Sequence, residues 1–162
     1  MNSRILKAFL FLIIFSLPIA SFEFSVMTLN SQNLFDTIDD KGKDDKAFLP
    51  IELKKSNKHI RSCKNIKVTS WKNECLYLDW DTETKDAKLR NLLTNIIDYD
   101  QKGPDVLALQ EVENENILRQ LFVLLKPYGY VDFKLIEGRD YRGIDTAIIS
   151  KFKILDSKLH YI

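Results

Sequence analysis

Two polar side chains, Asn30 and Glu111, close apolar runs of the sequence, and their types suit metal chemistry. Asn30 follows the run Phe24–Leu29, and Glu111 follows the run Asp105–Gln110. A carboxylate with an amide nearby offers the oxygen ligands that Mg²⁺ or Mn²⁺ prefers. A cation held in this way can polarise a phosphoryl oxygen and help to generate hydroxide. The pair is therefore a candidate site for metal-dependent phosphoester chemistry.

Other well-known catalytic patterns do not occur in the sequence. It contains no P-loop, no dinucleotide-binding glycine motif and no H-E-x-x-H zinc motif. A serine-nucleophile mechanism lacks its elbow motif, and only His59 and His160 could serve as its base. His59 lies in a polar stretch and His160 in a terminal run, so we interpret both as incidental to catalysis.

Positioning Asn30 and Glu111 requires strands that alternate with helices, which is the pattern of an α/β domain. Apolar runs predict strands at residues 24–30, 105–110, 131–136, 144–149 and 152–162. Apolar spacing predicts helices at residues 88–97 and between Asn114, a candidate cap, and Pro127. Functional residues collect at the carboxyl ends of strands in such sheets, where Asn30 and Glu111 are expected.

Between Asp36 and Trp80 this pattern changes to a long polar insertion, in which we expect one short helix. The insertion holds Cys63 and Cys75, which are 12 positions apart and are the only cysteines of the chain. An oxidising compartment would favour a disulfide between them, and the alternative is a pair of free thiols. A zinc site is a poorer interpretation, because no suitably spaced pair of histidines accompanies the cysteines.

The insertion also carries many basic side chains in residues 51–72. Lys54, Lys58 and Arg61 would share one face if this part were helical. The functional interpretation is a local patch that attracts phosphate, and the alternative is a solvated loop.

Composition and the start of the chain bear on its class and destination. The 162 residues, of which 45% are apolar and 29% charged, fit one domain rather than a disordered tail or a membrane bundle. Residues 1–20 combine a basic start, a short apolar run and a terminal Ala20, which predicts a secretory signal peptide. The run is too short to span a bilayer comfortably, and the alternatives are a buried first helix or an uncleaved anchor.

After signal cleavage we expect a secreted or periplasmic protein without a stable membrane span. Removing Arg4 and Lys7 with the leader reduces the 24 basic residues to 22, against 23 acidic ones. Global charge therefore does not recruit nucleic acid.

Three strand-like segments carry motifs that occur together in one superfamily. They are residues 24–36 (FSVMTLNSQNLFD), 105–113 (DVLALQEVE) and 142–150 (RGIDTAIIS). Residues 88–92 (KLRNL), at the start of the first predicted helix, agree with them in order and spacing. The chain resembles the endonuclease/exonuclease/phosphatase superfamily, in its deoxyribonuclease I-like, bacterial extracellular-nuclease-like branch. Apart from the insertion, the resemblance covers nearly all of the chain that follows the leader.

The resemblance implies a Mg²⁺- or Mn²⁺-dependent nuclease or phosphodiesterase built as a four-layer α/β/β/α sandwich. By position, Glu111 would bind the metal, and Asn30 would help to order the metal site or the nucleophile. Arg139, Tyr141 and Arg142 lie in the segment that meets substrate phosphate in deoxyribonuclease-like members, a task that suits arginine. The alternative for these three residues is a solvated turn.

Two motif positions limit how far the resemblance extends. Asp145 belongs to the third motif, and we expect it to make a structural hydrogen bond. Glu113 stands where the pancreatic deoxyribonuclease pattern has an arginine, so that enzyme's style of binding duplex DNA is not implied.

The second half of the family pattern has no counterpart in the sequence. In the family it supplies a Gly-Asp-x-Asn motif and a terminal Ser-Asp-His motif, which carry a water-orienting aspartate and charge-stabilising histidines. Residues 21–162 would then form the amino-terminal half of the sandwich, an incomplete catalytic domain. The sequence leaves open a phosphoester hydrolase, a non-catalytic remnant or partner-binding half-domain, and complementation by a separate carboxy-terminal half. It also leaves open whether the substrate is nucleic acid or another phosphodiester.

Overall fold

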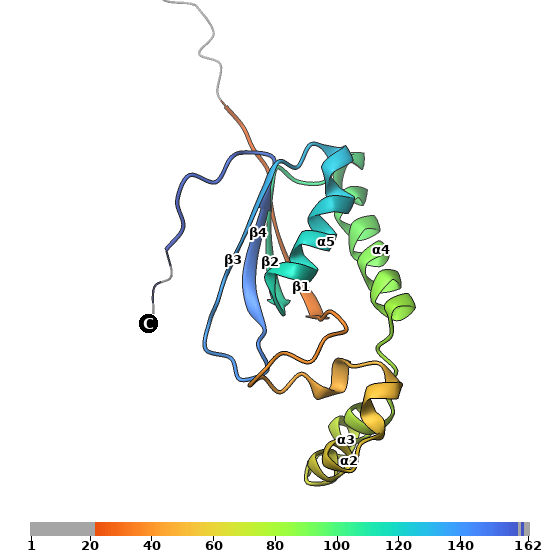
Figure 1. Cartoon of the computed structure of the whole chain (residues 1–162). Helices are drawn as coiled ribbons and strands as arrows, with labels where there is room; N and C mark the ends of the chain where they lie inside the picture. The colour runs from red at the N-terminus through yellow and green to blue at the C-terminus, as the bar shows by residue number, and fades with distance from the viewer. Residues whose placement is uncertain (1–21, 159, 161–162) are drawn as a thin grey trace, which may run out of the picture.

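The computed structural model describes residues 22–158 and residue 160. The chain is an α/β protein with one mixed sheet of four strands in the order β1-β2-β4-β3 (Figure 1). The strands are β1 (Val26–Leu34), β2 (Val106–Val112), β3 (Asp132–Ile136) and β4 (Asp145–Ser150). β1 and β2 are parallel, whereas β4 runs antiparallel to both β2 and β3. The first four predicted strands are therefore confirmed.

Two helices, α4 (Thr82–Asp98) and α5 (Glu115–Leu125), lie together on one side of the sheet (Figure 1). Each begins at a side-chain cap: Asp81 accepts a hydrogen bond from Thr84 N, and Asn114 accepts one from Ile117 N. The 3-10 turns η3 (Tyr99–Gln101) and η4 (Lys126–Tyr128) follow the two helices. Both predicted helices and the Asn114 cap are thus confirmed.

The core lies between this helix pair and the sheet. Helical spacing on α4 and α5 and strand alternation on β2 and β4 direct apolar side chains into the same layer. Its fully buried members are Leu34, Ile96, Leu107, Leu109, Val112, Ile117, Leu118, Leu121, Leu125 and Ile149. This core packs against β1 and β2, the strands that carry Asn30 and Glu111.

The opposite face of the sheet carries no helix among the described residues (Figure 1). Strand alternation places Val26, Thr28 and Asn30 of β1 on this face, and all three are exposed. Val26 is 61% exposed and Ile148 of β4 is 40% exposed. One face of the sheet is therefore packed and the other is open.

The insertion has more helix than the sequence predicted. It forms the 3-10 turns η1 (Lys46–Phe48) and η2 (Ile51–Lys55) and two α-helices, α2 (Asn57–Lys64) and α3 (Thr69–Tyr77). α2 begins where the Ser56 hydroxyl accepts a hydrogen bond from His59 N. These helices lie at the end of the sheet where β1 and β2 finish (Figure 1).

The predicted disulfide joins α2 to α3. Cys63 and Cys75 are bonded, with their Cα atoms 5.6 Å apart, and both are buried. His59 packs beside the bond, with Nε2 3.2 Å from Cys63 Sγ and 2.9 Å from Cys75 O. Among the described residues, these three form the one group of three or more His, Cys, Asp or Glu side chains that lie close enough together to share a metal ion, and here the sulfur atoms are paired with each other.

The predicted face of Lys54, Lys58 and Arg61 does not form. Lys54 lies in η2, outside α2, and is only 3% exposed, whereas Lys58 and Arg61 are exposed. Lys54 Nζ donates to Ala47 O, Glu74 O and Leu78 O at 2.7, 3.2 and 2.6 Å. Three carbonyl acceptors stabilise the buried ammonium group, so Lys54 holds the insertion together instead of facing solvent.

The strand predicted at residues 152–162 is wrong over the described part of this segment. β4 already pairs on both edges, with β2 and β3, and within residues 153–158 the chain does not pair with the outer edge of β3 or β1 either. Phe152 packs instead against Phe22 and Phe24, at ring-centroid distances of 5.6 and 6.4 Å. Ile154 N bonds only a side chain, Asp132 Oδ2.

The predicted signal peptide, residues 1–20, lies outside the described residues. Within the described part of the chain, no helix has the length and apolar character needed to cross a membrane.

Candidate functional site

Asn30 and Glu111 lie next to each other on the parallel strands β1 and β2, where the regular pairing of the two strands is interrupted near the carboxyl end of β2. Asn30 Nδ2 donates to Glu111 Oε1 at 3.0 Å, although the two residues are 81 positions apart in the sequence. The pairing register brings them together, because Asn30 is opposite Gln110 on the neighbouring strand. The two residues singled out from the sequence thus share one site.

A bulge turns the Glu111 side chain away from the core. Leu107 and Leu109 point to the core, so strict alternation would send residue 111 there too. The register instead shifts between Gln110 and Val112, Val112 takes the buried position, and Glu111 adopts a φ of 61°. Bulges of this kind often redirect a side chain beside an active site. A non-glycine residue at such a φ costs on the order of 1–3 kcal/mol, and such strain clusters at functional sites.

Ser31 supports the bulge from the opposite strand. Its hydroxyl lies 2.6 Å from Gln110 O and 3.0 Å from Glu111 O, and its side chain is fully buried. The single hydroxyl hydrogen is shared between the two carbonyl groups that flank the bulge. β1 bends at the same level, since Gln32 and Asn33 also have positive φ values of 53° and 61°.

Neutral donors hold the Glu111 carboxylate. Oε1 accepts from Asn30 Nδ2, and Oε2 accepts from Asn33 N at 3.0 Å. A carboxylate has about four acceptor positions, so both oxygens keep capacity for another partner. Within the described part of the chain, no ion pair involves Glu111. A half-exposed carboxylate with an amide beside it fits a hard divalent cation that retains waters.

Lys88 of α4 reaches the same place from the helix layer. Its ammonium group donates to Gln32 O at 3.0 Å, which ties the bend of β1 to the helix. Burial lowers the pKa of Lys88, and the nearby charge of Glu111 opposes that change. A cation beside Glu111 can attract an anionic substrate without pairing directly with the carboxylate.

The three residues expected to meet phosphate lie on the connection between β3 and β4. Arg139 and Tyr141 are exposed, and Arg142 is partly buried with Nε 3.4 Å from Asp140 Oδ1. Asp145 at the base of this connection accepts a hydrogen bond from Gly138 N, which is the structural role expected of it. The connection therefore has a fixed base and an exposed tip.

Tyr141 and Arg142 line a cavity of about 660 Å³ together with Asn33. The insertion forms most of the remaining wall. Asn33 connects the cavity to the candidate metal site, because it lines the cavity and its backbone N–H donates to Glu111. The β3–β4 connection and the residue that donates to Glu111 therefore border the same cavity.

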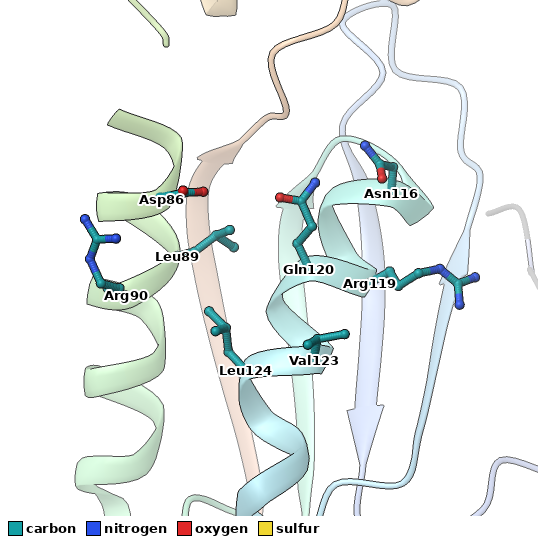
Figure 2. Close-up of a pocket in the computed structure, with 8 residues that line it drawn as sticks. All are labelled: Asp86, Leu89, Arg90, Asn116, Arg119, Gln120, Val123 and Leu124. Atoms are coloured by element: carbon teal, nitrogen blue, oxygen red, sulfur yellow. The ribbon is translucent and has the colours of Figure 1, made fainter. Parts of the chain in front are cut away.

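A second cavity, of about 460 Å³, lies between α4 and α5 and contains none of the residues singled out from the sequence. Figure 2 shows Leu89 and Leu124 reaching into this space from the two helices, with Asp86 and Gln120 near one end. It is a groove in the helix layer with an apolar floor.

Glu113 begins a buried acidic cluster behind the site. It is 3% exposed and accepts a hydrogen bond from Asp36 N at 2.6 Å. Burial first, and then the nearby carboxylates of Asp36, Asp40 and Asp45, raise the pKa of Glu113 to about 8. Burial likewise raises the pKa of Asp45 to about 6. A protonated Glu113 cannot take the phosphate-binding role of an arginine.

Sequence reasoning missed Ser31, Asn33 and Lys88 as parts of the site. All three lie inside the motif segments, but their contacts depend on backbone groups: a shared carbonyl pair, an amide donor and a carbonyl acceptor. The signal available in the sequence was a polar run, Ser31–Asn33, within an otherwise apolar strand.

Comparison with known proteins does not identify a relative. No protein-family model matches the chain, and neither the curated proteins nor the solved structures contain a significant match.

Proposed function

We propose that the chain is an exported, metal-dependent phosphoester hydrolase of the nuclease or phosphodiesterase type. The observation that carries the proposal is the contact between Asn30 and Glu111 at a strained bulge. Two motif residues that are 81 positions apart meet where the regular pairing of the parallel strands β1 and β2 is interrupted, toward the carboxyl ends of the strands, where α/β proteins place their ligands.

Each residue of the site has a distinct part in the proposed chemistry. Mg²⁺ or Mn²⁺ held by Glu111, with Asn30 beside it, would supply Lewis-acid polarisation of a phosphoryl oxygen. Asn30 Nδ2 orients the Glu111 carboxylate, and Asn33 N fixes its second oxygen. Lys88 adds positive charge at the mouth of the site. Such pre-orientation matters because hydrogen bonds to a metal ligand affect both metal affinity and rate.

The open sheet face supports the finer fold proposal, that this sheet is half of a four-layer α/β/β/α sandwich. In a two-sheet sandwich, inward-facing side chains of both sheets pack against each other. Val26 and Ile148 point from the open face, with exposed fractions of 61% and 40%. A second sheet would bury these side chains and would bring further polar residues toward Glu111.

Export is supported by the disulfide, since paired cysteines persist mainly in oxidising compartments. The bond between Cys63 and Cys75 is consistent with a periplasmic or secreted protein. Cytosolic disulfides also occur, so the leader has to be tested directly, by sequencing the amino terminus of the exported protein.

The test is hydrolysis of plasmid DNA and of bis(p-nitrophenyl) phosphate by the purified full chain with Mg²⁺. Glu111→Gln should lower the rate by roughly 100-fold or more, because it removes a metal-binding charge. Asn30→Ala should lower it by roughly 10- to 100-fold through misplacement of Glu111. The matched control is Glu115→Gln, an exposed glutamate at the start of α5 that pairs with Arg119.

The outcomes separate the candidate functions. Metal-dependent hydrolysis that Glu111→Gln removes and Glu115→Gln retains would support the proposal. Equal rates for the wild type and Glu111→Gln would contradict it. An absence of metal-dependent hydrolysis by the wild-type chain would also contradict catalysis by this chain.

The second candidate, a non-catalytic chain that binds a partner, is favoured by the open sheet face. An exposed apolar sheet surface promotes association. If the face is covered by another protein layer, Val26→Ser together with Ile148→Ser should weaken association in sedimentation experiments. If the wild-type chain forms complexes and the double variant sediments as the wild type does, this face is not the contact.

A further inference from the structure

The cavity beside the candidate metal site is largely made by the insertion, a part of the chain that the family resemblance does not cover. We call it the insertion cleft. Its volume is about 660 Å³, and its wall combines Lys67 and Trp71 of the insertion with Tyr141 and Arg142 of the β3–β4 connection. That volume is typical of sites that take a small molecule or one unit of a polymer.

Two large aromatic side chains of the cleft are exposed. Trp71 of α3 is 60% exposed and Tyr141 is 66% exposed. Neither ring makes a ring contact or a side-chain hydrogen bond within the described chain. By contrast, Trp80, the other tryptophan, is 8% exposed and donates from Nε1 to Phe35 O. Trp71 and Tyr141 thus present flat faces to whatever enters the cleft.

The charged groups of the cleft suit a ligand with both phosphates and a polar ring. Lys67 makes no ion pair within the described chain, whereas Arg142 lies 3.4 Å from Asp140. Lys67 and Arg142 can attract phosphate. Glu74, which also lines the cleft, can accept hydrogen bonds from the amino groups of bases, whereas Asp44 is paired with Lys46 of the same wall at 2.6 Å.

We infer that the insertion cleft binds an unstacked nucleotide of a nucleic-acid strand, with its base against Trp71 or Tyr141 and its phosphate near Lys67 or Arg142. Base stacking on aromatic side chains, combined with a positively charged groove, is how many proteins hold single strands. Asn33 places the cleft next to Glu111, since it borders the cleft and donates its backbone N–H to the carboxylate. The inference rests on the proposed function and narrows its substrate to nucleic acid.

The same features disfavour a lipid substrate. A lipid chain would have to desolvate Lys67, Arg142 and Glu74 without pairing them, which costs free energy. Inorganic phosphate, in turn, would leave the aromatic faces unused. Only a ligand with a flat polar ring and a phosphate uses all of these groups.

The disulfide holds the Trp71-bearing helix in place. Cys75 is the one buried residue of α3, so this helix has little apolar packing of its own. The bond from Cys75 to Cys63 and the contacts of Lys54 Nζ with Glu74 O and Leu78 O fix its carboxyl-terminal end. Reduction of the disulfide should therefore weaken nucleotide binding as well.

The experiment measures binding of fluorescein-labelled oligothymidylate to the full chain by anisotropy, with EDTA present to prevent cleavage. Trp71→Ala should weaken binding by roughly 5- to 150-fold, the effect of losing one stacked base. Tyr77→Ala is the matched control, because Tyr77 is a 71% exposed aromatic on the same helix that does not line the cleft. Quenching of Trp71 fluorescence by unlabelled oligothymidylate provides a second readout.

The outcomes test the cleft separately from catalysis. Loss of affinity in Trp71→Ala but not in Tyr77→Ala or Glu111→Gln would support the inference. If neither Trp71→Ala nor Tyr141→Ala binds more weakly than Tyr77→Ala, the inference is overturned, even if Glu111→Gln abolishes hydrolysis and so supports the proposed function. Binding to anionic phospholipid vesicles but not to oligothymidylate would also overturn it. If oligothymidylate binding needs Trp71 but the chain shows no Glu111-dependent hydrolysis, nucleotide binding in the cleft is supported and the proposed function is contradicted.

Discussion

The two regions of the molecule are held together by different forces. The body, which is the sheet with α4 and α5, buries a continuous apolar layer between helices and strands. The insertion, residues 36–80, has few such contacts and depends on individual ties: a disulfide, a buried lysine and aromatic packing. Phe48 stacks on Phe35 at 4.1 Å and meets the edge of Trp80 at 5.4 Å, which anchors the insertion to the body.

This difference explains where the candidate chemistry lies. The body supplies a rigid support for Glu111, because β2 is packed on its core side and paired on both edges. The insertion supplies a wall at the end of the same strands. Rigid strands suit a metal ligand that must be held within fractions of an ångström, and binding residues are often found on connecting segments that a rigid scaffold positions.

The largest expected effect is in the body. Leu118→Ala should lower the free energy of unfolding by about 2–5 kcal/mol, because Leu118 is fully buried in α5 and its truncation leaves a cavity. Val123→Ala, at a 54% exposed position of the same helix, should change it by less than about 0.5 kcal/mol. Urea unfolding measures both, and similar costs for the two variants would contradict the assigned core.

Removing the disulfide should act on the insertion and spare the body. Replacing Cys63 and Cys75 by alanine should cost the insertion about 3 kcal/mol, the loop-entropy value for a loop of this size. Hydrogen exchange should then become faster in α2 and α3 and stay unchanged in α4. An equal loss of protection in α4 would mean that the two regions unfold as one unit.

Lys54 tests whether a buried cation stabilises the insertion. Lys54→Ala should lower stability by about 1–3 kcal/mol, because three carbonyl groups lose their shared donor. Lys58→Ala, at an exposed position of α2, should have an effect within about 0.5 kcal/mol of zero. Thermal unfolding of the two variants gives the comparison. If Lys54→Ala does not change the stability, Lys54 behaves as a solvated side chain, which would contradict its role in the insertion.

The junction between the regions should make stability depend on pH. The pKa of Glu113 is about 8 in the folded chain and 4.5 in its ordinary state, with Asp36, Asp40 and Asp45 facing it. Between these values the unfolded chain releases a proton that the folded chain keeps, so the free energy of unfolding falls as the pH rises. The slope should approach about 1.4 kcal/mol per pH unit.

Urea unfolding at several pH values between the two pKa values measures this slope. Glu113→Gln should flatten it, whereas Glu115→Gln, at an exposed position, should not. The raised pKa of Asp45, about 6, adds a change of the same sign at lower pH. A stability that rises with pH across this range would contradict a protonated Glu113.

The body was predictable from the sequence because its forces leave periodic patterns. Leu89, Leu92 and Ile96 repeat at helical spacing, and they are the apolar residues of α4 that lie buried. The insertion was not predictable in this way, because Lys54 and most of residues 57–64 are polar, and the sequence does not indicate which of these polar side chains are buried. The terminal segment was wrongly predicted because Phe152 and Ile154 alternate as in a strand. In the structure, Phe152 packs against other aromatic rings and Ile154 N bonds Asp132 Oδ2.

The candidate site was predictable in its side chains and not in its backbone. Asn30 and Glu111 stood out because each is polar at the end of an apolar strand. The bulge that turns Glu111, and the Ser31 hydroxyl that supports it, arise from pairing between two strands. Strand pairing over 80 positions leaves no local pattern, so it can only be seen in the folded chain.

Mn²⁺ binding measured by electron paramagnetic resonance tests, without relying on turnover, whether Glu111 binds a divalent cation. The full chain should bind Mn²⁺, and excess Mg²⁺ should displace it. Glu111→Gln, with unchanged circular dichroism, should weaken binding by roughly 10-fold or more, while Glu115→Gln should bind as the wild type does. Equal Mn²⁺ binding by the wild type and by Glu111→Gln would contradict the account.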